Sequence, residues 1–218
     1  MGNIFNRQSN DLPPKILLGI VVLGFLFVMG ISYYFTPKYS RVGYMPTQPI
    51  PFDHSLHADQ LGLDCRFCHS YVEKSGFSNI PTTQTCMNCH RQIKMDSPKL
   101  APLRESWETG KPIKWVRIHQ LPDYVYFDHS AHVNRGISCV SCHGKVNQMQ
   151  KVYHDQPLSM SWCLDCHRNP EYFVRPPDKV FDLDWKPENE GETQRLLGKK
   201  LVKEMGIHPP ENCDACHR

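Results

Sequence analysis

Residues 139–143 read Cys139-Val-Ser-Cys142-His143, and this C-x-x-C-H spacing occurs five times in the chain of 218 residues. On a helical turn, the first, fourth and fifth positions of such a motif lie on one face. Two thiols and an imidazole placed in this way form the attachment site of a c-type haem. The pattern therefore predicts five covalent haems. Numbered one to five along the chain, the motifs contain Cys65, Cys68 and His69; Cys86, Cys89 and His90; Cys139, Cys142 and His143; Cys163, Cys166 and His167; and Cys213, Cys216 and His217.

Paired cysteines also occur in structural zinc sites, in disulfides and in redox-active C-x-x-C pairs. Any single copy of the motif fits one of these alternatives. Five copies, each followed directly by histidine and together using all ten cysteines, favour haem.

The chain is short for the number of haems. Residues 36–218 provide about 37 residues for each haem, too few to enclose every haem in its own core. The haems must therefore form much of the core and lie near one another. The expected fold is a mostly irregular and α-helical multihaem cytochrome c, with short helices around a stacked five-haem core and one N-terminal transmembrane helix. One ordinary helix is expected near residues 192–205, where apolar residues recur at helical spacing.

The formal net charge is +3 before any cofactor is counted. Each haem has two propionates that ionise near neutral pH, so five haems would bring the net charge to about −7. The basic balance of the sequence therefore gives no support to nucleic-acid binding. No paired carboxylates, P-loop or Ser/His/Asp arrangement stands out, and no catalytic residue is expected.

The N-terminal region contains a long apolar stretch at residues 16–35, enough to cross a bilayer as a helix. A cleaved secretory signal is the alternative, but the apolar run is longer than an ordinary signal core. Lysine and arginine counts on the two sides tie, so charge does not set the orientation. Similarity to c-type haem motifs implies attachment outside the bacterial cytoplasm. We therefore expect a cytoplasmic leader at 1–15, a span at 16–35 in the inner membrane and a periplasmic domain at 36–218.

An internal repeat precedes two of the motifs. Residues 52–57 read FDHSLH and residues 127–132 read FDHSAH; we call them hexad one and hexad two. Their offset is close to the offsets between motifs one and three and between motifs two and four. The sequence thus predicts a two-haem module used twice, at about 52–110 and about 127–180, followed by a fifth-haem tail at about 181–218.

Seven histidines lie outside the motifs and are candidates for the sixth position on each iron. His54, His57, His129 and His132 of the two hexads are the strongest, because histidines three residues apart can reach two different haems. His119 is the best single addition and would give every iron two histidines, leaving His154 and His208 as spares. Methionine is an alternative ligand for one haem, with Met160 the main candidate, although a buried methionine is more often core filler.

The hexads resemble the F-x-H-x-x-H pattern of class III multihaem cytochromes of the cytochrome c3 and c7 type. In that family the first histidine ligates the haem of the motif that follows, and the second ligates a different haem. The resemblance therefore implies that His54 serves motif one and His129 serves motif three, while His57 and His132 reach across to other haems.

Longer runs carry a closer resemblance. HQLPDYVYFDHSAHVNRGISCVSCHG (119–144) and LSMSWCLDCHR (158–168) are similar to the pentahaem subunit of alternative complex III, a bacterial quinol:electron-acceptor oxidoreductase. This resemblance covers nearly the whole chain. It implies an iron–sulfur subunit, polytopic quinol-binding subunits and a monohaem cytochrome c as partners, and electron transfer toward a periplasmic cytochrome c or a terminal oxidase.

Two other functions compete with an electron-transfer subunit. A stand-alone membrane quinol dehydrogenase of the NapC/NrfH kind is expected to have a C-x-x-C-H-x-M haem motif, which is absent here. A multihaem enzyme needs an iron with an open position, and the supply of histidines argues against one.

Overall fold

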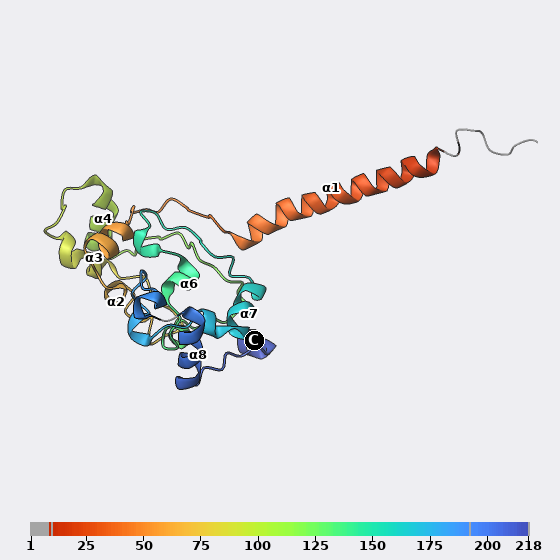
Figure 1. Cartoon of the computed structure of the whole chain (residues 1–218). Coiled ribbons are helices and arrows are strands. Elements are labelled where there is room, and N and C mark those ends of the chain that lie inside the picture. Colours follow the sequence, from red (N-terminus) through yellow and green to blue (C-terminus); the bar gives the residue numbers. More distant parts are fainter. Residues whose placement is uncertain (1–8, 10, 192, 218) are drawn as a thin grey trace, which may run out of the picture. The chain divides into compact units, whose positions relative to one another are not determined.

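The computed structural model describes residues 9, 11–191 and 193–217. Within these residues the chain forms helices and irregular segments, and no β-strand (Figure 1). Two isolated antiparallel bridges join Val125 to His217 and Ile137 to Val174. This confirms the expected mostly irregular and α-helical fold class. The chain divides into two compact units, Met1–Arg41 and Val42–Arg218.

The first unit consists mainly of one helix, α1 (Leu12–Ser40). Its segment Leu12–Tyr33 is long and apolar enough to cross a membrane, and none of its most apolar stretch is buried against the protein. A signal sequence near an N-terminus would have the same length and composition. The helix is longer at both ends than the apolar run 16–35 indicates. At its N-terminal end, Pro13 and Pro14 fall in the first turn, where proline is tolerated.

Each C-x-x-C-H motif lies on a helical turn, as the spacing requires. The five elements are α2 (Cys65–Cys68), α3 (Thr83–His90), α6 (Cys139–His143), α7 (Met160–Arg168) and α9 (Cys213–Cys216). Side-chain caps fix where two of them begin. Asp64 accepts a hydrogen bond from the backbone N–H of Arg66, and Ser159 accepts one from that of Trp162.

The hexads also form short helical turns. Hexad one leads into η2 (Ser55–Gln60), a π-helical turn, and hexad two leads into α5 (His129–Val133). Other short elements are η3 (Pro98–Leu100), α4 (Ala101–Thr109), η4 (Val146–Gln148), η5 (Pro170–Tyr172), η6 (Pro177–Lys179) and η7 (Pro187–Glu190).

The longest helix of the second unit is α8 (Gln194–Glu204), which confirms the helix expected near 192–205. Leu197 and Leu201 of α8 pack with Val174, Trp185 and Ile207 in one buried cluster. Gly198 lets α8 approach η5 closely, because a Cβ atom there would meet the backbone carbonyl of Glu171.

The apolar core is small and divided. Besides the α8 cluster, one cluster joins Ile50, Met87 and Leu103 and holds α4 against α3 (Figure 1), and another joins three valines. A domain of this size ordinarily has one contiguous core. Many large apolar side chains of the second unit are instead exposed in the protein alone, including Phe67, Phe77 and Ile80. Such surface is what covalently attached porphyrins would cover.

Candidate haem sites

All ten motif cysteines are free thiols, so none is committed to a disulfide. Burial raises the pKa of seven of these thiols and is the largest cause in each case. It raises the pKa of Cys139 to about 11, that of Cys142 to about 12 and that of Cys166 to about 11. Among the described residues, no group of three or more His, Cys, Asp and Glu side chains is arranged to hold a metal ion directly.

Four of the five motif histidines are oriented by the backbone. In each, the ring Nδ1–H donates to a carbonyl oxygen, which leaves Nε2 free to bind iron. The bonds run from His69 to Asn79 (2.7 Å), from His90 to Ile93 (3.0 Å), from His167 to Pro210 (2.6 Å) and from His217 to Tyr124 (3.3 Å). The sequence does not indicate which carbonyls take this role, because every residue type has a backbone carbonyl.

The two hexads share one local structure in which every fixed letter has a role. In hexad one, a side-chain oxygen of Asp53 accepts hydrogen bonds from the Leu56 backbone N–H (3.1 Å) and the Ser55 hydroxyl (2.6 Å). The Asp53 carbonyl accepts the Nδ1–H of His57 at 2.8 Å. The Phe52 ring lies 4.4 Å from the ring of His57 and 4.8 Å from that of His54.

Hexad two repeats each of these contacts. The Asp128 carboxylate accepts hydrogen bonds from the Ala131 backbone N–H (3.2 Å) and the Ser130 hydroxyl (2.7 Å). The Asp128 carbonyl accepts the Nδ1–H of His132 at 2.7 Å. The Phe127 ring centroid lies 4.4 Å from that of His132 and 4.8 Å from that of His129. The F-D-H-S-x-H pattern therefore builds a capped turn that displays two histidines.

Three pairs of histidine rings lie at a common separation. Their centroids are 6.3 Å apart for His57 and His90, 6.1 Å for His132 and His167, and 6.4 Å for His129 and His143. A metal bonded at about 2 Å to two opposed imidazole nitrogens would place the ring centres about 6 Å apart. In all but His143, a carbonyl holds the Nδ1 atom, so the free nitrogen is Nε2. The residues thus fit an iron between each pair.

His54 lies near His69 of motif one. Burial, and after it the nearby His69, lower the pKa of His54 to about 4. A buried imidazole kept neutral retains the lone pair that a metal ligand needs. Its Nδ1 atom is buried without a hydrogen-bond partner in the described part of the chain.

His119 lies beside motif three. Its ring is 4.3 Å from that of His143, closer than an intervening iron allows, and 5.2 Å from that of His154. Burial lowers the pKa of His119 to about 4, and burial lowers that of His143 to about 3. His154, which looked like a spare histidine in the sequence, is among the most buried polar residues at 1% exposure, whereas His208 is exposed.

Motif five differs from the others. Among the described residues, which include all twelve histidines, no histidine ring makes a ring contact with His217; its ring neighbour is Tyr124 at 5.6 Å. Met160 begins α7 with 65% of its surface exposed. Burial raises the pKa of the Cys163 thiol, and the Cys216 thiol of motif five raises it further, so α7 lies near motif five.

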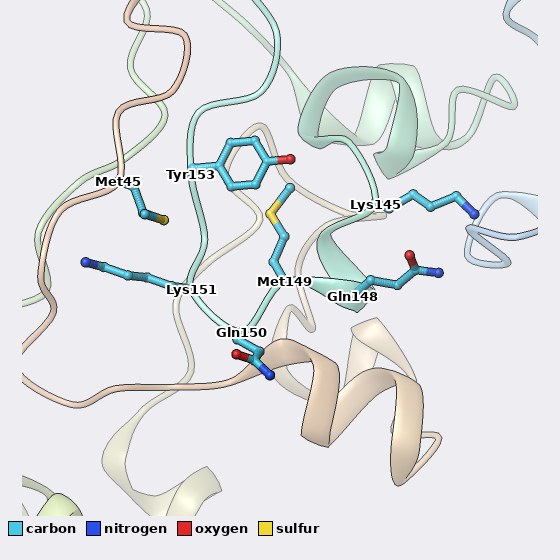
Figure 2. Close-up of a pocket in the computed structure, with 7 residues that line it drawn as sticks. All are labelled: Met45, Lys145, Gln148, Met149, Gln150, Lys151 and Tyr153. Carbon is cyan, nitrogen blue, oxygen red and sulfur yellow. The ribbon is translucent and has the colours of Figure 1, made fainter.

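A surface pocket of about 510 Å³ lies beside hexad one and holds none of the predicted ligands (Figure 2). Its lining comprises Met45, Lys145, Gln148, Met149, Gln150, Lys151 and Tyr153. Met149 is buried at 6% exposure and lines the pocket together with Tyr153 (Figure 2). This placement matches the core-filling role that is usual for methionine.

Comparison with known proteins places these sites in a family context. Residues 125–218 match the family described as cytochrome c7 and related cytochrome c. A curated relative is the "Menaquinone reductase, multiheme cytochrome c subunit" of Nitratidesulfovibrio vulgaris. The two are 32% identical over 143 residues, which cover 56% of this chain and 68% of that protein.

Proposed function

The chain belongs to the multihaem cytochromes c of the cytochrome c7 type, and from that premise we propose that it is a membrane-anchored pentahaem subunit carrying electrons between quinone and another redox protein. Membership implies covalently bound haem c, and the bound haems supply one-electron chemistry. The observation that carries the proposal is the set of histidine pairs spaced for an iron. An iron with a protein ligand on each side would have no open position for a substrate, so it would exchange electrons only.

We assign three ligand pairs from the ring geometry and the fourth, His54 with His69, from the electrostatic effect of His69 on His54 and from the repeat of the hexads. Each of the first four sites takes its motif histidine and one hexad histidine. The pairs are His69 with His54, His90 with His57, His143 with His129, and His167 with His132. His119 then packs behind His143 and helps to keep that imidazole buried and neutral.

For site five we propose Met160 as the sixth ligand. His217 has no histidine opposite it among the described residues, and α7 brings the exposed Met160 to the vicinity of motif five. Methionine ligation raises a haem's potential relative to histidine. The Met160→Ala variant should lose the near-infrared band of methionine-ligated ferric haem and keep all five haems by mass. Retention of that band in the variant would exclude this ligand.

The proposed setting is a quinol-oxidising complex of the alternative complex III kind, in the bacterial inner membrane. In this proposal α1 is the anchor, the N-terminus is cytoplasmic, and the two modules and the tail are periplasmic. The relative is a subunit of a menaquinone reductase, which supports a quinone-linked assembly. The partners would be an iron–sulfur subunit, polytopic quinol-binding subunits, a monohaem cytochrome c and a terminal oxidase.

The name of the relative favours a second candidate, with electrons running toward menaquinone. The two directions require different potentials. Potentials above that of the quinone pool favour quinol oxidation, and potentials below it favour quinone reduction. A spectroelectrochemical titration of the five haems decides between them.

The test of the main proposal compares the isolated subunit with the intact complex after rapid mixing with quinol. We expect five haems per chain by pyridine haemochrome, slow haem reduction in the isolated subunit and fast reduction in the complex. One helix gives little room for a quinol pocket, which is ordinarily built between helices. Fast reduction of the isolated subunit would instead identify a stand-alone dehydrogenase of the NapC/NrfH kind.

A further inference from the structure

The contacts between sites give their order in space. Within each hexad the two histidines stand on one turn and face different motifs. His54 lies near His69 of motif one, while His57 faces His90 of motif two. Hexad two joins motifs three and four in the same way. Sites two and one are therefore neighbours, and so are sites three and four.

Hydrogen bonds from each hexad join the two modules to each other. The backbone N–H groups of His54 and Ser55 donate to the carbonyl of Met149, at 3.1 and 3.3 Å. In return, the backbone N–H of His129 donates to Gly76 at 3.3 Å, and its Nδ1–H donates to the same carbonyl at 2.9 Å. Because the first histidine of each hexad serves site one or site three, this exchange places those two sites side by side.

Site five is attached beside site four. The Nδ1–H of His167 donates to the carbonyl of Pro210, three residues before motif five. Arg168, which follows His167, pairs with Glu211 at 3.0 Å. The contacts thus give a single row in the order two, one, three, four, five.

The cysteine thiols support this order independently. Of the seven thiols whose pKa burial raises, four have a thiol of a neighbouring site as the next largest cause. These neighbours are Cys86 for Cys68, Cys65 for Cys139, Cys166 for Cys142 and Cys216 for Cys163.

The two ends of the row differ in charge. Residues 91–117, which we call the basic lobe, follow motif two directly and contain seven lysines and arginines against three acidic residues. The cluster of Met87 and Leu103 holds this lobe on α3. Residues 207–218 around motif five contain two acidic residues, Glu211 and Asp214, against the single basic residue Arg218.

Three lysines of the basic lobe are available to a partner. Lys99, Lys111 and Lys114 are exposed, and the ion pairs recorded within the described residues involve none of them. Exposed Ile93 and Met95 belong to the same lobe. An excess of positive charge together with exposed apolar side chains favours docking of a partner of opposite charge.

We infer that site two is the terminal site of the row two–one–three–four–five, and that the basic lobe docks the acidic face of a protein redox partner there. This inference rests on the proposed electron-transfer function. Each encounter passes one electron between the partner and the chain, with no bond made or broken, so the electron that one protein loses is the one that the other gains.

The test measures reduction of the full-length, haem-loaded chain by reduced flavodoxin, a small acidic one-electron donor, in a stopped-flow instrument. The K99E/K111E/K114E variant reverses three charges on the basic lobe. The matched control, K199E/K200E/K203E, reverses three exposed lysines on α8. At low ionic strength the lobe variant should react about tenfold more slowly, and the control should change by less than about twofold. High salt should remove the difference.

Equal slowing of both variants, or no slowing of the lobe variant, would overturn the docking surface. Dithionite separates this failure from a failure of the proposed function, because haems that neither donor reduces would contradict electron transfer itself. The row has its own test. Anomalous diffraction at the iron edge should place site two next to site one alone, and a second iron adjacent to site two would overturn the order.

Discussion

Hexad one and hexad two have the same local structure but hold their first histidine differently. In both, the second histidine is fixed from inside the hexad by the carbonyl of its own aspartate. The first histidine of hexad two, His129, donates its Nδ1–H to Gly76 in the other module. The Nδ1 atom of His54 is buried and has no hydrogen-bond partner among the described residues. Local sequence therefore orients one ligand, and tertiary packing orients the other.

The largest expected effect comes from removing a second histidine. His57→Ala should remove one iron ligand at site two, and His132→Ala should remove one at site four. In neither case does the affected site belong to the motif that comes next in the chain. Each variant should show one high-spin haem and bind one carbon monoxide per chain, where the unaltered protein binds little. Magnetic circular dichroism and carbon monoxide titration measure both.

The exposed His208 provides the control for these variants. His208→Ala should leave all haems low-spin. Assignment of the opened site to motif one in His57→Ala, or to motif three in His132→Ala, would break the bridging role common to the two hexads.

Removing the aromatic ring of a hexad should have the next largest effect. Phe52 and Phe127 each lie against both histidines of their hexad. Phe52→Ala should lower the free energy of unfolding by about 2 kcal/mol. Phe127→Ala should cost less, because Phe127 remains 37% exposed. Guanidinium unfolding followed by far-UV circular dichroism measures both, and a larger loss for Phe127→Ala would contradict the burial argument.

Much of this organisation can be predicted from the sequence because it depends on short-range geometry. The C-x-x-C-H spacing requires a helical turn, and all five motifs have one. The F-D-H-S-x-H recurrence indicates a repeated unit, and its aspartate and serine cap the turn that carries the histidines. The helix α8 follows from its apolar spacing, although Leu196 is exposed and does not join the buried side.

The features that the sequence does not predict depend on contacts between distant segments. The carbonyls of Asn79, Pro210 and Tyr124 orient ligands, yet any residue type could supply them. The order of the sites arises from the exchange of hydrogen bonds between modules. The sequence favours His119 as a fifth distal ligand, but the fold places its ring against His143, closer than an intervening iron allows. Its position in the chain, outside both hexads, gives no sign of this contact.

Replacing the first histidine of each hexad with methionine sharpens the difference between them. His129→Met removes the donor to Gly76 and should cost about 1 kcal/mol of stability. His54→Met removes a buried nitrogen that lacks a partner, so its cost should be smaller by about that amount. Denaturant unfolding of the two haem-loaded variants measures the gap. Equal losses would mean that the hydrogen bond to Gly76 contributes little.

The smallest expected effect concerns the hexad serines, whose hydroxyls donate to Asp53 and Asp128 at 2.6 and 2.7 Å. Ser55 is buried at 9% exposure, so Ser55→Ala deprives the Asp53 carboxylate of a donor that water cannot easily replace. Ser130 is more accessible, and water can take the place of its hydroxyl. We expect a loss of about 1 kcal/mol for Ser55→Ala and about half of that for Ser130→Ala, measured by denaturant unfolding. If Ser130→Ala cost as much as Ser55→Ala, burial would not be what distinguishes the two turns, and the hydrogen bond itself would account for both losses.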